Sequence, residues 1–396
     1  MNAGNGAQAD PPVLVIVPVY RGLGITRNCL ESLADCDLPP GVSVLVIDDC
    51  SPEPGLSEYC REVTARAGFE LMVNDENLGF VASANRGFDF RPEADVILLN
   101  SDTVVANDWI ERLRACAYHG DRVGTVTPFS NNGTICSYPV FLQSSDLPAG
   151  WSAAELDQLV RRANAGTYVE VPTGVGFCLY VRRSCLDETG PFDVDNFGQG
   201  YGEECDFCLR AADLGWRHHL AADTFVYHEG GASFAGESAR RKREADGVLN
   251  ELHPRYHELV TDFIERDPPR DCRAAIDAGR ISERPDLAPD LLEEQRRNTD
   301  TLRERLQEYS AAIGAERDRA HQLDLMLEEC RQRFEEVDSA LSDARRVVDD
   351  LNAGIAQQKK EIENGQIYAH GLETHIHNME QSRSWRYTAW LRRKPK

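Results

Sequence analysis

The 396-residue sequence contains no apolar run long enough to cross a membrane. The apolar stretch Val13–Val17 ends at Pro18, whereas a membrane-spanning helix needs about 20 residues. The residues before this stretch carry no Lys or Arg, so the pattern of a secretory signal is missing as well. We therefore expect a cytoplasmic protein, whose only membrane contact would be peripheral, at the cytoplasmic face.

Positive charge is scarce. The sequence holds 43 Lys and Arg against 66 Asp and Glu, which gives a formal net charge of -23. A chain with that charge repels nucleic acid and anionic lipid alike. We expect no nucleic-acid partner, and any membrane contact must come from a local basic segment.

Cysteine is present, but not in a pattern that indicates disulfides or zinc. Twelve cysteines occur in a chain without an export signal, which favours reduced thiols. Cys205 and Cys208 form one CxxC, and no second pair or nearby pair of histidines completes a four-ligand zinc site.

From Val13 onward, short β-rich runs alternate with helical stretches. The β-rich runs are VLVIVPVY, VSVLVID, ELMVN, VILLNSD, YVEVPTGVGFCLYVRR and TFVYHEG. This alternation predicts βαβ units and an α/β fold with a mostly parallel, Rossmann-like sheet. We place the globular domain at residues 13–266 and expect residues 1–12, which are rich in Gly, Asn and Ala, to be disordered.

The character of the chain changes after the globular domain. Residues 267–290 contain DPP and RPDLAPD and are predicted to be a linker. Residues 291–381 are predicted to be a coiled coil, because apolar residues recur at alternating spacings of four and three from Leu302 to Met379, with exceptions at Glu316, Gln358 and Gly365. At a rise of about 1.5 Å per residue, the stretch from Leu302 to Met379 would form a rod about 115 Å long. So long an apolar seam needs a partner, either a homo-oligomer or a separate helix; the alternative is a single helix folded back on the globular domain.

The last segment, residues 382–396, is basic and aromatic. Its sequence SRSWRYTAWLRRKPK contains no acidic residue. Aromatic rings next to Lys and Arg suit the headgroup region of an anionic membrane surface. Contact with a membrane surface and a basic tail without a ligand are both compatible with this composition.

Polar clusters stand where apolar elements end or begin. Asp48-Asp49 and Asn100-Ser101-Asp102 each follow a strand-like run, and the acidic cluster Glu203-Glu204-Cys205-Asp206 opens a helical stretch. Open α/β sheets bind ligands at the carboxyl ends of their strands. Acids also favour a helix N-terminus for electrostatic reasons alone. The strand-end carboxylates nevertheless indicate an enzyme.

Four motifs, in this order, resemble family 2 glycosyltransferases with the GT-A fold: VIVPVYRG, VIDDCSPEPG, NLGFVASANRGF with VILLNSDT, and GYGEECDFCLR with VYHEGG. They cover roughly residues 13–235. The resemblance implies a transferase for a hexosyl or deoxyhexosyl group. It also implies a donor that is a nucleotide sugar, UDP- or dTDP-linked, and an acceptor hydroxyl on a glycan or lipid-linked glycan of a cell-surface polysaccharide.

The resemblance also implies a nucleotide and donor site. Asp48 and Asp49 would accept hydrogen bonds from the base and the ribose, although one of them could instead cap the following turn. Asn77 and Gly79 could likewise form only a turn. The remaining residues assigned to the donor by this resemblance are Pro18, Tyr20, Asn85, Asn100, Ser101, Asp102 and Gly174.

The same resemblance implies a divalent metal, Mn²⁺ or Mg²⁺. Asn100-Ser101-Asp102 stands where many relatives carry Asp-x-Asp, so the neutral Asn100 leaves Asp102 as the metal-binding carboxylate. His228 corresponds to a position that supplies a second ligand, and mixed oxygen and imidazole ligation suits Mn²⁺. A lone histidine is otherwise more often structural.

For catalysis, the resemblance implies that Glu204 removes the proton from the acceptor hydroxyl and that the sugar is transferred with inversion. Glu203 is the second candidate for this base, and Asp206 and Thr173 would contact the acceptor. A scaffold that has lost activity and organises glycan-assembly proteins through its coiled coil is the alternative function. A nucleotidyltransferase is disfavoured, because the loop after the first strand, Tyr20–Gly24, carries a single cation.

Overall fold

The computed structural model describes residues 11–198, 200–230 and 237–382. The expected N-terminal tail, up to residue 10, and the basic tail, from residue 383, therefore lie outside the described residues. The chain divides into two compact units, Met1–Thr299 and Asp300–Lys396.

The first unit is built on an eight-stranded sheet with the strand order β3-β2-β1-β4-β8-β6-β9-β7. Strands β3, β2, β1 and β4 run parallel, as do β6 and β9, whereas β8 and β7 run antiparallel to their neighbours. The sheet is thus mixed and mostly parallel, as predicted. The strands are β1 (Val13–Val19), β2 (Val42–Asp48), β3 (Glu70–Val73), β4 (Asp95–Leu99), β6 (Val123–Phe129), β7 (Tyr168–Val171), β8 (Cys178–Val181) and β9 (Arg217–Phe225).

Helices cover both faces of this sheet. Side chains alternate along a strand, so Val13, Val15 and Val17 of β1 enter one core cluster while Leu14 and Ile16 enter the other. The first cluster is covered by α1 (Leu23–Ala34), α2 (Leu56–Ala67) and α4 (Trp109–Ala117). The second is covered by α3 (Phe80–Phe90), α6 (Arg183–Thr189), α7 (Val194–Phe197), α8 (Glu203–Asp213) and α9 (Glu237–Leu252).

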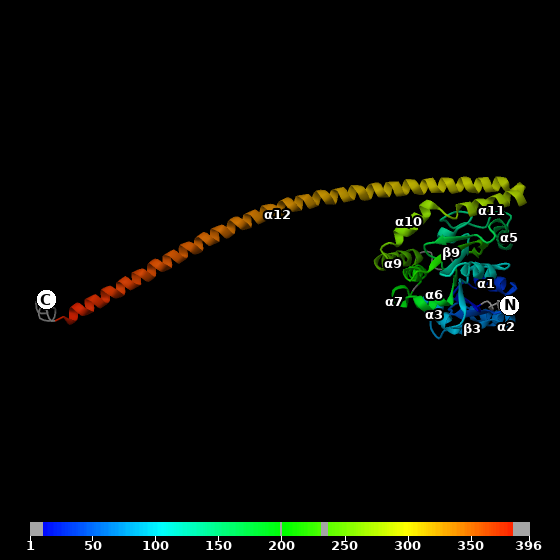
Figure 1. The fold of residues 1–396 in the computed structure, drawn as a ribbon, viewed down its shortest axis with the longest axis horizontal. Coiled ribbons are helices and arrows are strands. Elements are labelled where there is room, and N and C mark those ends of the chain that lie inside the picture. The colour runs from blue at the N-terminus through cyan, green and yellow to red at the C-terminus, as the bar shows by residue number, and fades with distance from the viewer. Residues whose placement is uncertain (1–10, 199, 231–236, 383–396) are drawn as a thin grey trace, which may run out of the picture. The chain divides into compact units, whose positions relative to one another are not determined.

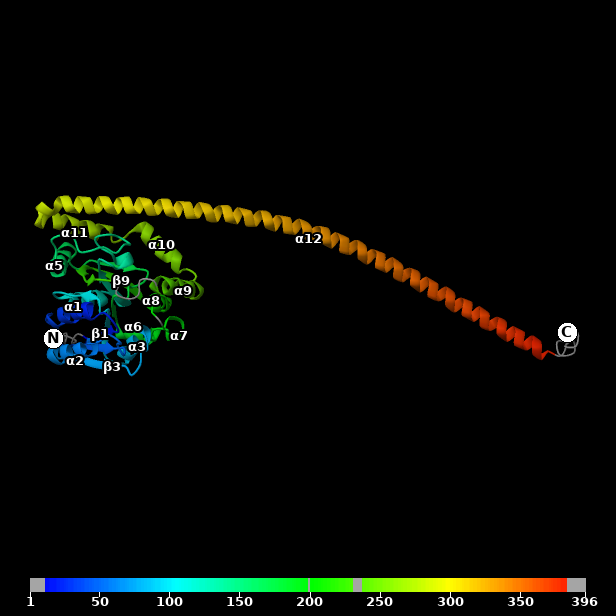
Figure 2. The ribbon, with the colours of Figure 1, turned by 180° about the vertical axis from the view of Figure 1, so that it is seen from behind.

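A third core cluster lies at the β9 end of the sheet, which Figure 1 shows opposite β3. It includes side chains of α5 (Ala153–Ala163), α10 (Tyr256–Arg266) and α11 (Arg270–Glu283). Helix α5 begins with a capping box, in which the Ser152 side chain accepts from Glu155 N–H and the Glu155 side chain accepts from Ser152 N–H. The views in Figures 1 and 2 both place α5 and α11 next to each other.

The segment expected to be a linker is structured. Residues 267–290 form α11, a short 3₁₀ helix (Pro285–Leu287) and the start of α12. Cys272 and Ile276 of α11 are buried in the third core cluster. Prolines stand at the starts of these helices, Pro269 as the N-cap of α11 and Pro285 in the first turn of the 3₁₀ helix. Proline is tolerated there because the first helical N–H groups have no intrahelical partner, so the motifs DPP and RPDLAPD mark helix starts.

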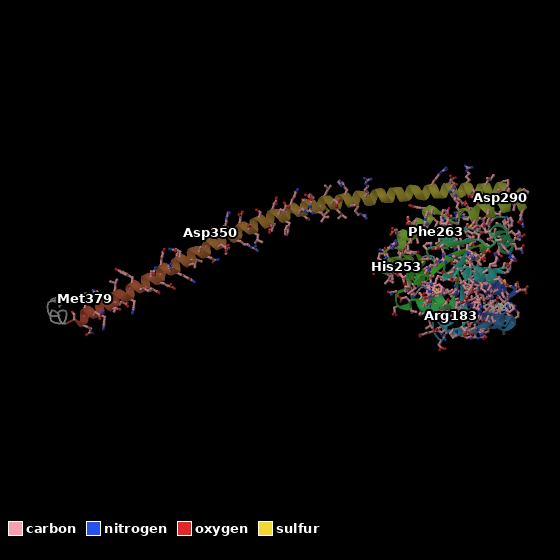
Figure 3. The ribbon with its side chains drawn as sticks, viewed as in Figure 1. Arg183, His253, Phe263, Asp290, Asp350 and Met379 are labelled. Carbon is pink, nitrogen blue, oxygen red and sulfur yellow. The ribbon has the colours of Figure 1, made fainter. Side chains whose placement is uncertain are left out.

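Helix α12 (Ala288–Gln381) is 94 residues long and accounts for the described part of the second unit. Figure 1 draws it as one continuous helix, and Figure 3 shows side chains around it at Asp350 and Met379. The predicted long C-terminal helix is confirmed. None of the helices in the part of the chain that the structure describes has the length and hydrophobicity that a membrane span requires.

Candidate active site

The carboxyl ends of β1, β2 and β4 lie side by side, because these strands are parallel and in close register. β2 ends at Asp48 and is followed by Asp49, while β4 is followed by Asn100-Ser101-Asp102. Pro18 lies within β1 and pairs with Ile47, and the half-buried Tyr20 follows that strand. The sheet therefore gathers these sequence-predicted residues at one edge.

Both aspartates after β2 already have partners inside the protein. Asp48 accepts hydrogen bonds from Ser51 N–H (2.9 Å) and from the Ser57 hydroxyl. Asp49 accepts from Leu78 N–H (2.8 Å) and Gly79 N–H (2.9 Å), and both carboxylates are almost fully buried. Asp48 thus holds the turn that leads into α2, and Asp49 holds the turn that leads into α3.

A buried asparagine that the sequence reasoning missed joins this arrangement. Asn74, 2% exposed, donates from Nδ2 to Asp49 Oδ1 (2.7 Å) and to the Ser83 hydroxyl (2.9 Å), and its Oδ1 accepts from Arg86. The sequence pattern that could have indicated this role is the position of Asn74, a polar residue directly after the strand-like run ELMV. Asn74 therefore fixes Asp49 relative to α3.

The turn from residue 77 to 79 and the side chain of Asn85 serve local structure. Asn77 Oδ1 accepts from Gly79 N–H (3.0 Å), and Gly79 has a φ of 83°, which favours glycine. Asn85 exchanges two hydrogen bonds with the Phe192 backbone, donating to its carbonyl (2.9 Å) and accepting from its N–H (3.0 Å). The Asn85 amide is thus occupied by the loop before α7.

A short two-stranded ladder brings Asp102 and His228 together. β5 (Thr103–Val104) pairs antiparallel with β10 (Tyr227–His228), with His228 opposite Thr103. Asp102 Oδ1 and His228 Nε2 lie 3.2 Å apart, and the side chains are 16% and 14% exposed, respectively. Residues separated by more than a hundred positions in the sequence thus present an oxygen and a nitrogen to one point.

The orientation of His228 is fixed by three contacts. Its Nδ1 lies 2.8 Å from the Asn132 carbonyl oxygen, and because a carbonyl can only accept, Nδ1 carries a proton. Its backbone N–H donates to Asn131 Oδ1 (2.8 Å), and its ring stacks on Phe177 with 5.2 Å between centroids. A proton on Nδ1 leaves Nε2 of the neutral imidazole as the lone-pair nitrogen, which is the arrangement typical of metal-ligating histidine.

Asn100 and Ser101 lie between β4 and this ladder. Asn100 N–H donates to the Phe177 carbonyl (2.8 Å), and the Asn100 carbonyl accepts from the Thr103 hydroxyl (2.8 Å). Asn100 Oδ1 is buried and has no hydrogen-bond partner within the described part of the chain. A buried amide oxygen without a donor is costly, so this position suits a ligand hydroxyl or N–H.

Glu203 and Glu204 open helix α8 after Gly202, whose φ of 90° places the helix start in a left-handed turn. Burial raises the pKa of both carboxyls, and the neighbouring Glu204 raises the pKa of Glu203 further. Hydrogen bonds from backbone N–H groups, including that of Gly176, act in the opposite direction on the pKa of Glu204. In the described structure, Oε2 of each carboxyl lacks a hydrogen-bond partner.

The segment from Thr173 to Phe177 connects the two halves of the site. A Cβ at Gly176 would lie 3.4 Å from Glu204 Cδ, so the Glu204 carboxyl packs against the backbone of Gly176. The next residue, Phe177, contacts both His228 and Asn100. Two consecutive residues therefore link the surroundings of Glu204 to the pair Asp102 and His228.

Other predicted residues of this segment and of α8 are held by internal contacts. Gly174 lies close to Leu179, and a Cβ at this position would come within 2.4 Å of Leu179 Cδ1. Thr173 is buried against Cys205, with 3.9 Å between Thr173 Oγ1 and Cys205 Sγ. Asp206, 2% exposed, accepts from Arg210 (2.8 Å) and lies 2.9 Å from His253 Nε2. Asp206 thus fastens α8 to the connection between α9 and α10.

The mixed sheet, with polar residues at the carboxyl ends of its parallel strands, defines an α/β enzyme of the GT-A type. The family model described as "Glycosyltransferase like family 2" matches residues 11–247, and the chain belongs to this family of nucleotide-sugar transferases. The predicted family and fold class are confirmed.

Among curated proteins, the chain is 24% identical over 220 residues to Glycosyltransferase AglE of Haloferax volcanii, covering 55% of this chain and 67% of that protein. It is 28% identical over 222 residues to the uncharacterized protein Rv1525 of Mycobacterium tuberculosis, covering 55% of this chain and 74% of that protein.

Two solved structures have similar folds. One is the mannosyltransferase PcManGT from Pyrobaculum calidifontis in complex with GDP-Man and Mn²⁺ (TM-score 0.45, 17% identity, 69% of this chain and 75% of that one). The other is GalNAc-T7 with UDP, GalNAc and Mn²⁺ (TM-score 0.44, 16% identity, 64% of this chain and 55% of that one).

Proposed function

We propose that this chain is an inverting, metal-dependent glycosyltransferase. The donor would be a UDP- or dTDP-linked hexose or deoxyhexose, and the acceptor a hydroxyl of a glycan or lipid-linked glycan. The observation that carries the proposal is the pair Asp102 and His228, 3.2 Å apart and joined through Gly176 and Phe177 to the carboxyl of the half-buried Glu204. Metal-binding atoms and a candidate base thus border one segment of the chain.

The residues at the β5–β10 ladder fit a divalent cation. Asp102 offers a carboxylate oxygen, and His228, with its proton on Nδ1, offers Nε2. No group of three or more His, Cys, Asp or Glu in the described ranges could hold a metal ion by itself, so the diphosphate and water would complete the coordination. A bound Mn²⁺ or Mg²⁺ would neutralise charge on the departing diphosphate.

Glu204 is proposed to accept the proton of the acceptor hydroxyl as that oxygen attacks the anomeric carbon. Its burial and its raised pKa favour proton uptake, and Oε2 lacks a partner among the described residues, so it can accept from a substrate. Ionised Glu204 raises the pKa of Glu203, which favours the protonated form of Glu203 while Glu204 acts as the base.

On the donor side, Asn100 Oδ1 is proposed to accept a hydrogen bond from the nucleotide sugar, with Ser101 next to it. Tyr20 and Pro18, at the end of β1, would border the same ligand. Asp48 and Asp49 have internal partners but keep further acceptor capacity, because a carboxylate offers about four lone-pair positions. The shape of the donor site would depend on the backbone conformation at four predicted residues, Asn77, Gly79, Asn85 and Gly174. The shape of the acceptor side would depend in the same way on Thr173 and Asp206.

The biological setting is proposed from composition. Cell-surface polysaccharide assembly at the cytoplasmic face of a membrane fits a family 2 transferase with a basic, aromatic segment at residues 382–396. Deleting residues 382–396 should reduce binding to anionic liposomes, and unchanged binding would contradict the proposed membrane contact.

The metal is tested by hydrolysis of a panel of UDP- and dTDP-sugars with and without Mn²⁺. Asp102→Ala should lower the metal-dependent rate about 100-fold or more, because the ligand and its charge are lost. Asp89→Asn, on the exposed side of α3, serves as the control and should keep the wild-type rate. No metal-dependent hydrolysis by wild type or variant would favour the inactive scaffold instead.

The base is tested by transfer to an acceptor hydroxyl. Glu204→Gln should lower kcat about 100-fold or more, whereas Glu203→Gln should change it much less, because glutamine resembles the protonated form of Glu203. Equal losses in both variants would contradict this assignment.

A further inference from the structure

We propose that α12 pairs with the α12 of a second copy of this chain as a parallel, in-register, two-stranded coiled coil in which the two Cys330 side chains face each other. This pairing involves the second unit and does not depend on the proposed chemistry of the first.

The helix carries an exposed apolar seam. Counting Leu327 as heptad position a and Cys330 as position d, the seam runs from Ala320 to Met379 at spacings of three and four. Side chains between 42% and 71% exposed lie at these a and d positions: Leu323, Leu327, Phe334, Val337, Leu341, Val348, Leu351, Ile355, Ile362, Leu372, Ile376 and Met379. Three more, Met326, Val347 and Tyr368, lie at position g and border the seam. So much apolar surface on one helix requires a covering partner.

The distribution of residue types along the seam favours two strands. Position a carries the β-branched residues Val348, Ile355, Ile362 and Ile376, and position d carries leucine at 323, 351 and 372. β-branched residues at a together with leucine at d favour parallel dimers over higher assemblies.

Gln358 selects the direction and the register. It occupies heptad position d. In an antiparallel pair, position d of one helix faces position a of the other, and every residue at position a from Ala320 to Ile376 is apolar. The Gln358 amide would then be buried without a hydrogen-bond partner, which is costly. In a parallel pair without a shift, the two Gln358 amides meet and can bond to each other.

The flanking charges agree with this arrangement. In a parallel pair, position g faces position e of the following heptad in the partner. Arg319 would then face Asp324, and Arg333 would face Asp338. From Arg319 to Glu380, no g residue faces an e residue of the same charge. Charge complementarity therefore points to a second copy of the same helix.

Cys330 is an exposed thiol at a d position, and it reports on this geometry. In the proposed pair the two thiols lie at the same level of the seam. In an antiparallel pair centred on the same stretch they lie at different levels, beyond the reach of a disulfide.

The test combines sedimentation with thiol cross-linking of the full-length chain carrying Cys50→Ser, which removes the other exposed thiol. Diamide is the oxidant: it takes up the two thiol hydrogens, and one S–S bond replaces two S–H bonds. We expect a dimer in sedimentation and a cross-linked dimer on non-reducing gels. Cys330→Ser should abolish the cross-link while the dimer in sedimentation persists.

The matched control moves the thiol to the outer face of the helix, in the double variant Cys330→Ser with Gln332→Cys. Position 332 is f in the heptad, so its cross-linking should be slower by about tenfold or more. A monomer or a trimer in sedimentation would overturn the proposal. So would a dimer in which Cys330 reacts no faster than the thiol at position 332. Hydrolysis of the donor sugar, measured on the same samples, reports separately on the proposed chemistry.

Discussion

At the scale of single residues, the protein places two adjacent carboxyls at the start of α8, those of the buried Glu203 and the half-buried Glu204. Burial raises the pKa of each, and the like charge of Glu204 raises that of Glu203. This arrangement stabilises the protonated form of Glu203, and it therefore makes protein stability depend on pH.

We expect Glu203→Gln to become stabilising as the pH rises. In the wild type, the unfolded chain loses the Glu203 proton near pH 4.5, whereas the folded protein keeps it to higher pH. The contribution of Glu203 to the free energy of unfolding of the wild type is therefore fully present below about pH 4.5 and declines above that pH. The variant has no such decline, so the amount by which its Tm exceeds that of the wild type should grow as the pH rises above 4.5.

Thermal unfolding of both proteins across this range measures the effect, with Glu93→Gln, an exposed position, as the control. A Tm difference that stays constant with pH would contradict the argument.

At the scale of elements, the close packing of α3 on β1 sets the distance between the turn at Gly79 and the sheet edge. Gly87 of α3 lies directly over Ile16 of β1, and a Cβ there would come within 2.7 Å of Ile16 Cδ1. Asn74 and Asp49 hold the start of the same helix by hydrogen bonds. The position of α3 therefore depends on a glycine in its interior.

Gly87→Ala should destabilise the protein by about 1–3 kcal/mol, because the added methyl group must displace Ile16 or the helix. Gly247, in α9, offers a matched control, since a Cβ there meets no atom within 4 Å. Gly247→Ala should be neutral or stabilising by up to about 1 kcal/mol, because alanine has the higher helix propensity. Denaturant unfolding of the two variants makes the comparison, and equal free energies of unfolding would contradict it.

At the scale of the whole molecule, the globular unit extends beyond the point where the sequence suggested that it ends. Helix α11 contributes Cys272 and Ile276 to the third core cluster, and Leu291 in the first turns of α12 is buried as well. Asp277 and Arg280 of α11 also bond to the Tyr138 hydroxyl. The catalytic unit therefore includes the segment expected to be a linker.

A chain ending at Thr299 should be more stable than a chain ending at Arg266 by several kcal/mol, because each large apolar side chain removed from a core costs about 2–5 kcal/mol. Circular dichroism with thermal unfolding of the two truncated chains measures the difference. Equal Tm values would show that α11 adds nothing to the core.

The sequence by itself determined the family, the mostly parallel sheet, the polar residues at the ends of β2 and β4, and the long C-terminal helix. These features depend on local signals: period-two and heptad patterns, and motifs a few residues long. The roles of individual residues could be predicted only in part. Asp48, Asn85 and Asp206 stay predicted ligand contacts, and the hydrogen bonds that each makes within the protein could not be inferred from local sequence.

Only the tertiary structure decided which distant residues meet. The contact of His228 with Asp102 depends on the pairing of β5 with β10. The hydrogen bond from Asn74 to Asp49 and the contact of His253 with Asp206 depend on how the helices pack. The burial of Ile276 depends on the third core cluster. Strand register and helix packing are non-local, because their free energy comes from contacts between segments far apart in the chain. A local pattern does not specify those contacts.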